Sequence, residues 1–418
     1  MRISPRVASV CTALPFAFTL AAICGGSPIS AEQPSPVAKP SGASGAAVRL
    51  RAVGPDSTRG RADAVVVEAG ALVHTALFRP VDARGRVQGA GDAAAQAAHI
   101  LDALATALKS AGTGLEHVAR LNVYVADASV ATVIDPVITK RFSGRATPAM
   151  TFVESRMPVT GTLVAMDAIA ATGLASATAT RIAVTGLAPA AGGSAHVAVQ
   201  PAGPFVIVSG RAAPGEFDAA VKGTIEQLRG DLKTAGLGLD HVVHVKSFLG
   251  DMTRAQELQR LVAESFGGTA PPQVVTEWRD SSLPVEIELV ATASRATGTE
   301  RVTFVEPISS RYSRVARVFE GQPVFVAGLT GTSADPAAQV REIFDQLRRI
   351  VTDAGSDMRH VAKATYYVAD KVADQEINTV RPSIYDAARP PAASKISVPG
   401  TGRAGKATVI DFIAVTTR

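Results

Sequence analysis

Three acidic residues in this sequence could do chemistry, because each interrupts an apolar run: Asp167 in LVAMDAIA, Glu288 in VEIELVA and Asp411 in TVIDFIA. A lone carboxylate among apolar side chains costs free energy unless it meets a partner or water. A carboxylate held in this way can order a water molecule and take its proton, so we predict these three residues as catalytic candidates. The structural alternative, in which each acid only accepts hydrogen bonds within the fold, stays open. A ligand-facing role is favoured more for Glu288 than for the two aspartates.

Three histidines, His117, His241 and His360, could bind a metal or act as general bases. Each occurs once in similar surroundings, at the start of a strand-like run directly after a helix stop. That placement favours a structural role, and we predict neither a metal site nor a cofactor.

The elements that position these residues occur three times along the chain. His241 follows His117 by 124 residues, and His360 follows His241 by 119 residues. A four-residue apolar face precedes each histidine at the same offsets, a glycine lies five residues before it, and an aspartate lies ten residues after it. The faces are Ala97, Leu101, Leu104 and Leu108, then Val221, Ile225, Leu228 and Leu232, then Val340, Phe344, Leu347 and Val351, and the glycines are Gly112, Gly236 and Gly355. This spacing predicts a helix, a left-handed helix stop and a strand in each unit of an internal triplication.

Each unit is predicted to contain two strands, a helix, a strand, a second helix and two closing strands, in the order β-β-α-β-α-β-β. That order indicates an α+β fold with both helices on one face of a sheet. We expect the units at residues 48–174, 181–295 and 300–418. Because the linkers between them are short, we expect the three sheets to close a three-fold ring within one chain. The mature protein should then be a monomer.

The composition indicates which class of protein the sequence encodes. The chain has 418 residues, of which 47% are hydrophobic and 19% are charged, as is usual for a globular protein. Its formal net charge of +5 is mild, and no lysine- or arginine-rich run occurs. We therefore expect no nucleic-acid partner.

The N-terminus predicts export. Residues 1–31 combine two arginines, an apolar stretch and a small-residue cleavage point, as a signal peptide does. Residues 32–47 have no periodicity and are expected to form a disordered linker. Cleavage would remove both cysteines, Cys11 and Cys24, and leave a secreted or periplasmic protein that is not held at a membrane. A lipid anchor at Cys24 is the alternative, although the bulky Ile23 disfavours it.

Each unit resembles the RidA/YjgF family of imine deaminases, also described as endoribonuclease L-PSP. The matching features are Gln96 in the first helix, the Val-Tyr-Val of the central strand, Asp127 at its end and the Asp-Ala-Ile-Ala that begins at Asp167. The resemblance covers essentially the whole mature chain. It implies a chorismate-mutase-like fold, which the family uses as a homotrimer with ligand clefts between subunits, and therefore a covalent pseudo-trimer here.

The same resemblance implies that the family's chemistry is altered. In the family, the arginine of a Pro-Ala-Arg motif binds the carboxylate of a small imino acid, and a glutamate helps to place the attacking water. Here the three motifs end in Met150, Gln273 and Ala393, so the arginine is absent from every unit. The family's Ser-Gly pair is kept at Ser209, and its asparagine is kept as Asn378, with Asp135 at the equivalent place in the first unit.

These residues lead to a principal hypothesis and two alternatives. We predict an exported protein that binds a small metabolite in clefts between its units, with Ser209, Gln273, Asn378, Met150, Ala393 and Asp135 as ligand-binding candidates. The main cleft is expected around Gln273 and Glu288, and the amide of Gln273 favours an uncharged ligand. The first alternative is a residual imine or enamine deaminase, or a hydrolase of a related substrate. The second, an endoribonuclease, is disfavoured by the mild charge.

Overall fold

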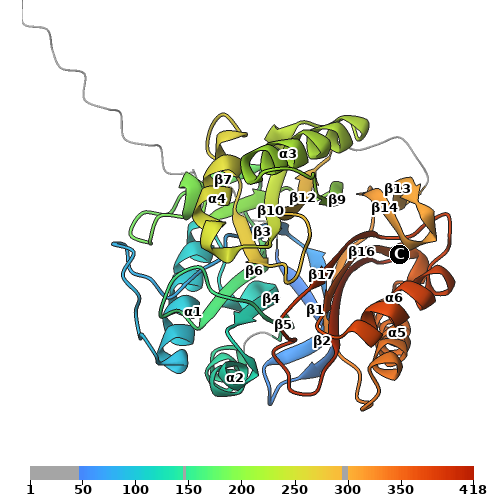
Figure 1. The fold of residues 1–418 in the computed structure, drawn as a ribbon, viewed down its shortest axis with the longest axis horizontal. Helices are drawn as coiled ribbons and strands as arrows, with labels where there is room; N and C mark the ends of the chain where they lie inside the picture. The colour runs from blue at the N-terminus through green and yellow to red at the C-terminus, as the bar shows by residue number, and fades with distance from the viewer. Residues whose placement is uncertain (1–46, 145–146, 294–299) are drawn as a thin grey trace, which may run out of the picture. The chain divides into compact units, whose positions relative to one another are not determined.

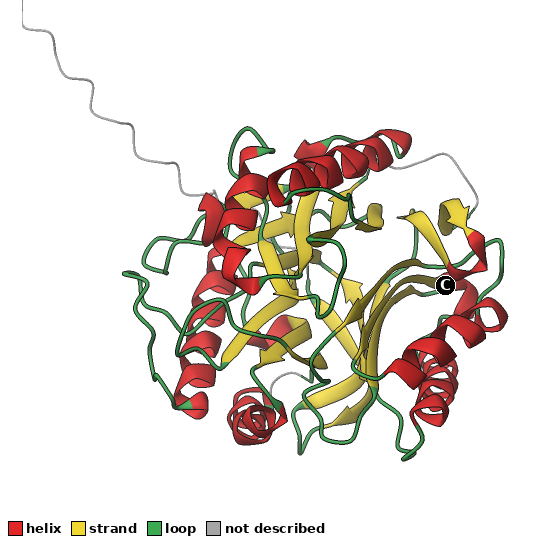
Figure 2. Cartoon of the chain, viewed as in Figure 1, coloured by secondary structure: helices red, strands yellow, loops and turns green. Residues whose placement is uncertain are grey.

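A computed structural model of the chain describes residues 47–144, 147–293 and 300–418. The described residues contain six α-helices and eighteen β-strands (Figure 1; Figure 2). The predicted signal peptide, residues 1–31, and all of the predicted linker except Ala47 lie outside the described residues. No helix in the described part of the chain is long and apolar enough to cross a membrane.

The first repeat begins with three strands and ends with two strands that follow its second helix. Its elements are β1 (Arg49–Asp56), β2 (Arg61–Ala69), β3 (Ala71–Thr75), α1 (Ala93–Ser110), β4 (Val118–Val125), α2 (Ala128–Phe142), β5 (Ala149–Glu154) and β6 (Val164–Thr172).

The second and third repeats follow the same order. The second has β7 (Thr180–Ile182), β8 (Val197–Gln200), β9 (Phe205–Arg211), α3 (Phe217–Thr234), β10 (Val242–Leu249), α4 (Ala255–Glu264), β11 (Gln273–Glu277) and β12 (Val285–Thr292). The third has β13 (Val302–Ile308), β14 (Tyr312–Val318), β15 (Pro323–Leu329), α5 (Pro336–Asp353), β16 (Val361–Val368), α6 (Lys371–Ile384), β17 (Ala392–Ser397) and β18 (Thr408–Val415). Each repeat therefore opens with one strand more than the sequence pattern predicted.

The predicted helical faces are buried, and the predicted glycine stops are left-handed. Ala97, Leu101, Leu104 and Leu108 of α1 have no exposed surface, because the apolar stripe packs against the sheet. Gly112, Gly236 and Gly355 have φ values of 70°, 75° and 78°, a conformation that a side chain would strain. The aspartates that end the central strands also begin the next elements, since the carboxylate of Asp127 accepts backbone N–H bonds from the start of α2.

Each repeat forms its own small sheet, and the three sheets are joined edge to edge. In the first repeat β4 pairs in parallel with β5 and antiparallel with β6, which in turn pairs with β3. The repeats are connected by three antiparallel pairs, β3 with β8, β9 with β14, and β15 with β2. Because the last of these pairs links the third repeat back to the first, the strands close into a ring within one chain. The three tandem repeats thus form the predicted pseudo-trimer.

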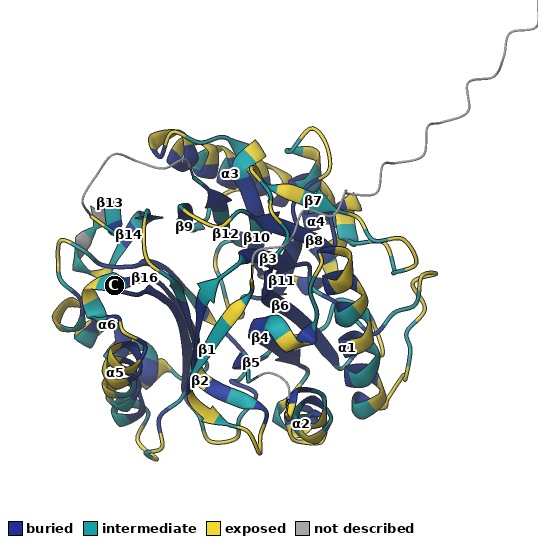
Figure 3. Cartoon of the chain, turned by 180° about the vertical axis from the view of Figure 1, so that it is seen from behind, coloured by how far each residue is buried: buried dark blue, intermediate teal, exposed yellow. Residues whose placement is uncertain are grey.

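The helices lie outside the ring of strands, and the strands are the most buried part of the fold (Figure 1; Figure 3). Each repeat has a core between its helices and its sheet. Two further apolar clusters contain residues of all three repeats, one around Ile169, Ile207 and Phe325 and the other around Tyr124, Phe248 and Tyr367. These two clusters lie where the inner faces of the three sheets meet.

Candidate functional site

The three predicted catalytic acids lie together in one buried cavity where the repeats meet. Asp167, Glu288 and Asp411 all line this cavity, which has a volume of about 60 Å³. Each acid comes from the last strand of its repeat and faces the central strand, where Asn122, Lys246 and Thr365 are the opposite residues. The structure thus places all three acids at the centre of the ring, on the inner faces of the sheets.

Cations from neighbouring repeats balance these acids in a cyclic order. Arg120 of the first repeat donates to Asp411 of the third over 3.2 Å, and both side chains are almost fully buried. Lys363 of the third repeat forms an ion pair with Glu288 of the second, and the Ser394 hydroxyl donates to the same carboxylate oxygen over 2.5 Å.

The third acid of the cycle belongs to the first repeat. The charge of Lys246, in the second repeat, acts on Asp167, whose Oδ2 accepts a bond of 2.8 Å from Asn122. The cation of each repeat thus lies beside the acid of another repeat.

Lys246 differs from the other two cations because aromatic rings surround its ammonium group. Its Nζ lies 5.6 Å from the ring centres of Tyr124 and Phe248 and 5.2 Å from that of Tyr367. It also donates to the Tyr367 hydroxyl over 2.5 Å. These aromatic residues hold equivalent positions in the three central strands, so the pseudo-trimer builds one cation–π site from three repeats.

Burial and these charges determine the protonation of the titratable side chains that line the cavity. Burial acts to raise the pKa of Glu288, but the charges of Lys363 and Lys246 outweigh it and leave that pKa below its ordinary value. Burial raises the pKa of Asp167, a shift that the Lys246 charge only partly offsets. Burial lowers the pKa of His74 to about 4, and burial together with the charges of His74 and Lys246 lowers that of His244. Both imidazoles are therefore neutral at pH 7.

Several polar atoms of the cavity lack a hydrogen-bond partner among the described residues: His74 Nδ1, Arg120 Nε, Asn122 Oδ1 and Asp167 Oδ1. Buried polar groups of this kind are usually satisfied by water, and the cavity is large enough for a few water molecules. It is too small for a metabolite, so the ligand candidates must be sought in the clefts between the repeats.

The cleft between the third and first repeats contains Met150. Its volume is about 320 Å³, and Gly328 and Val409 of the third repeat line it together with Met150 and Phe152 of the first. Three arginines also line it. Arg59 pairs with Asp56, and the other two are Arg61 from β2 and Arg403 from the loop before β18. The guanidinium of Arg403 lies 4.1 Å from the centre of the Phe152 ring.

The two arginines share one carboxylate, that of Asp135 on α2. Asp135 pairs with Arg61 through one oxygen and with Arg403, at 3.5 Å, through the other. Asp135 therefore orients the two guanidiniums. Burial lowers the pKa of Arg403, and the neighbouring charge of Arg61 acts in the same direction.

The junction of the second and third repeats contains Ser209 and Ala393 in direct contact. The Ser209 hydroxyl donates to the carbonyl oxygen of Ser313 over 2.6 Å and accepts from the N–H of Ala393 over 2.8 Å. Beside them, Glu286 lies against Gly210 so closely that a Cβ at Gly210 would meet the Glu286 carboxylate at 1.9 Å. In the cleft at Met150, Val409 likewise lies close to Gly328. A Cβ at Gly328 would lie 2.7 Å from Cγ2 of Val409.

Comparison with known families identifies the repeats. The model of the endoribonuclease L-PSP family matches residues 58–172, 185–294 and 305–415. The chain belongs to this family. No curated protein matches the chain.

Solved structures of the RidA/YjgF family correspond to about one repeat each. A Rid-family protein of unknown function from Yersinia pestis is 25% identical, with 29% of this chain and 98% of that one covered and a TM-score of 0.28. A YjgF/YER057c/UK114 family member from Mycobacterium tuberculosis is 30% identical, with 25% and 86% covered and a TM-score of 0.22. A YjgF family protein from Neisseria meningitidis is 25% identical, with 24% and 85% covered and a TM-score of 0.22.

Glu286 is one of the polar residues that the sequence patterns did not identify. Burial raises its pKa to about 7, the Ser394 hydroxyl partly opposes that shift, and the Glu288 charge adds to it. Its Oε1 has no hydrogen-bond partner among the described residues, although the residue as a whole is partly exposed. The alternating sequence Val285-Glu286-Ile287-Glu288 could have identified this residue, because it puts Glu286 on the same face of the strand as Glu288.

The remaining predicted residues occupy separate places. Gln273 is buried, donates to the carbonyl oxygen of Gln259 over 3.1 Å and has an unpartnered Oε1 within the described structure. It does not line the central cavity that contains Glu288, so the structure does not bring these two residues into one cavity. Asn378, on α6, accepts a bond of 3.2 Å from Lys395, which also pairs with Asp374.

The repeated histidines end short turns before the central strands. His117 contacts Thr113, and His360 pairs with Asp357 over 2.7 Å. In the described ranges, no group of three or more His, Cys, Asp or Glu side chains is arranged to hold a metal ion.

Proposed function

We propose that this RidA-family chain is an exported, monomeric protein that binds a small metabolite in the cleft between its third and first repeats. The observation that supports this function most is the pair of arginines in that cleft. Arg61 and Arg403 share a single carboxylate, Asp135, so the two guanidiniums have more N–H donors than their partner can accept from.

The lining of this cleft favours a small polar carboxylate as the ligand. The three arginines of the lining outnumber its two aspartates, Asp56 and Asp63, and Asp56 pairs with Arg59. One positive charge is then left over beside the apolar floor formed by Met150 and Val409. A guanidinium can bind a carboxylate through two parallel hydrogen bonds, which would replace the grip of the missing motif arginine.

Replacing Arg403 by glutamine tests this function. Pyruvate and lactate should bind the wild-type protein more tightly than their amides in calorimetric titrations. Arg403→Gln should weaken carboxylate binding about tenfold to a hundredfold, because a hydrogen bond to a charged group contributes roughly 1.5–3 kcal/mol. Arg260→Gln, which removes an exposed arginine paired with Glu264 on α4, is the control and should bind as the wild type does. Equal binding by both variants would contradict the proposal.

A second candidate function, hydrolysis of an imine, is favoured by Glu286. A carboxyl group with a pKa of about 7 and an unpartnered oxygen can act as a general base near neutral pH. Ammonia release from 2-iminobutanoate should then rise with pH through about 7 as Glu286 loses its proton. The activity should be lost in Glu286→Gln and kept in Glu226→Gln, which changes an exposed glutamate of α3. Release no faster than in buffer would exclude this function.

A further inference from the structure

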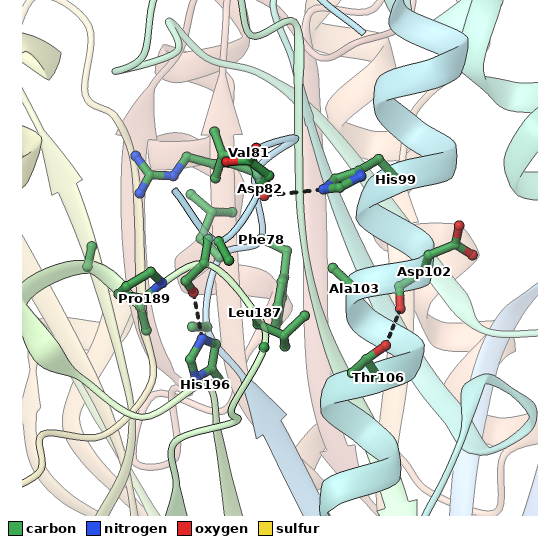
Figure 4. Close-up of a pocket in the computed structure, with 18 residues that line it drawn as sticks. Phe78, Val81, Asp82, His99, Asp102, Ala103, Thr106, Leu187, Pro189 and His196 are labelled. Carbon is green, nitrogen blue, oxygen red and sulfur yellow. Dashed lines mark hydrogen bonds between the residues drawn. The ribbon is translucent and has the colours of Figure 1, made fainter. Parts of the chain in front are cut away.

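A second cavity lies between the first helix of repeat one and the beginning of repeat two (Figure 4). Its volume is about 300 Å³. One wall is α1, with His99, Ala103 and Thr106, and the opposite wall is residues 186–191. Neither Met150 nor any other residue of the cleft between repeats three and one lines this cavity, so the two are separate.

The wall formed by residues 186–191 is held in place by His196. The backbone N–H of Val184 donates to Nδ1 of His196 over 3.0 Å, and Nε2 of His196 contacts the carbonyl oxygen of Ala188 at 2.8 Å. Both ring nitrogens are therefore used within the wall. The wall presents Leu187 and Pro189 to the cavity, together with alanines, so this side is apolar (Figure 4).

The charged residue without a partner in this cavity is Arg79. Its guanidinium has no ion pair or side-chain hydrogen bond to any residue that the structure describes, although it is partly buried and burial lowers its pKa. A desolvated cation with no partner is costly. An anion bound in the cavity would remove that cost.

The two acids in the cavity lining do not supply this anion, because each already has an arginine outside the cavity. Asp82 pairs with Arg86 over 2.7 Å, and Asp102 pairs with Arg141 over 2.5 Å. The net charge left in the lining is the single positive charge of Arg79. His99 donates through Nε2 to the carbonyl oxygen of Val81 at 3.2 Å, which leaves its other ring nitrogen unused in the described contacts (Figure 4).

We propose that this cavity is a binding site for a small monocarboxylate with an apolar body. Arg79 binds the carboxylate, and Leu187, Pro189 and Ala103 contact the apolar part. A dianion such as phosphate is disfavoured, because one guanidinium would face two charges while Asp82 and Asp102 lie close by. The site is independent of the ligand proposed for the cleft at Met150.

The test measures binding of 3-methylbutanoate and of its neutral amide to the full mature chain by calorimetry. The acid should bind at least tenfold more tightly than the amide. Arg79→Gln should weaken binding of the acid at least tenfold and leave the amide unchanged. Arg84→Gln is the matched control, because Arg84 is an exposed arginine of the same turn that does not line the cavity.

Two further variants distinguish binding in this cavity from binding in the cleft at Met150. Ala103→Phe fills the cavity from α1 and should abolish binding of both the acid and the amide, even if Arg79→Gln does not fold. Arg403→Gln should leave 3-methylbutanoate binding unchanged, because it alters only the cleft at Met150. The proposal is overturned if the acid and the amide bind equally, if Ala103→Phe binds as the wild type does, or if Arg403→Gln is the variant that loses binding.

Discussion

Replacing Arg120 by methionine should lower the free energy of unfolding by about 3–5 kcal/mol, the cost of removing one partner from a buried ion pair. The guanidinium of Arg120 donates to Asp411, and to the carbonyl oxygens of Val326 over 2.8 Å and Phe412 over 2.5 Å. Methionine fills similar space but leaves the Asp411 carboxylate buried without that cation. Urea denaturation of the two proteins at pH 7 measures the difference.

Two variants make this result interpretable. Arg141→Met breaks the exposed pair with Asp102, so it should cost less than about 1 kcal/mol. The double variant Arg120→Met with Asp411→Leu removes both buried charges and should recover most of the loss, because an apolar pair avoids the desolvation of two ions. If Arg120→Met is no less stable than Arg141→Met, the central ion pair does not hold the third repeat to the first.

The local elements could be predicted from the sequence because their patterns are short. The predicted helical faces are buried and the predicted glycine stops are left-handed, since helical periodicity and helix stops depend on neighbouring residues. The family and the three-fold ring followed from the repetition of these local patterns, and both are confirmed. The opening strands β1, β7 and β13 were missed because β7 has only three residues and a proline lies within each of β1 and β13.

The central cavity could not be predicted, because ring closure creates it. Arg120 and Asp411 are 291 residues apart in the chain, and no local pattern marks them as partners. The positions of the three cations also differ between the repeats. Arg120 and Lys363 stand at equivalent positions where the second repeat has His244, and its cation, Lys246, lies two residues later. A comparison of repeats therefore finds the three acids and misses the cations that balance them.

The arginines of the cleft at Met150 were missed for a related reason. Met150, Gln273 and Ala393 stand at the motif positions, and nothing in these local motifs points to Arg61 or Arg403. Arg61 and Arg403 reach the cleft from β2 and from the loop before β18, at opposite ends of the folded chain. Their convergence depends on the pairing of β15 with β2, which joins the third repeat to the first.

Glu286 should make the protein less stable as the pH rises from about 4.5 to about 8. In the folded state burial raises the pKa of Glu286 to about 7, whereas an unfolded glutamate has its ordinary value of 4.5. Between these values the folded state binds more protons than the unfolded state, so the free energy of unfolding falls as pH increases. The loss is at most about 3 kcal/mol, since one pKa unit corresponds to about 1.4 kcal/mol.

Other buried groups change stability in this pH range, so the contribution of Glu286 must be isolated by comparison. His74 acts in the opposite direction. Burial lowers its pKa to about 4, so the unfolded state binds more protons below pH 6.5 and stability falls on acidification. The wild-type curve alone therefore mixes a gain and a loss of stability between pH 4.5 and 6.5.

Glu286→Gln separates the two contributions because glutamine does not titrate. Relative to the wild type, this variant should gain up to about 3 kcal/mol between pH 5 and pH 8, and urea denaturation at both pH values measures that gain. Glu226→Gln, at an exposed position, should track the wild type at both values. A difference between Glu286→Gln and the wild type that is the same at pH 5 and pH 8 would mean that Glu286 is already ionised at the lower pH. It would then have no raised pKa to use as a base near neutrality, and the second candidate function would lose its basis.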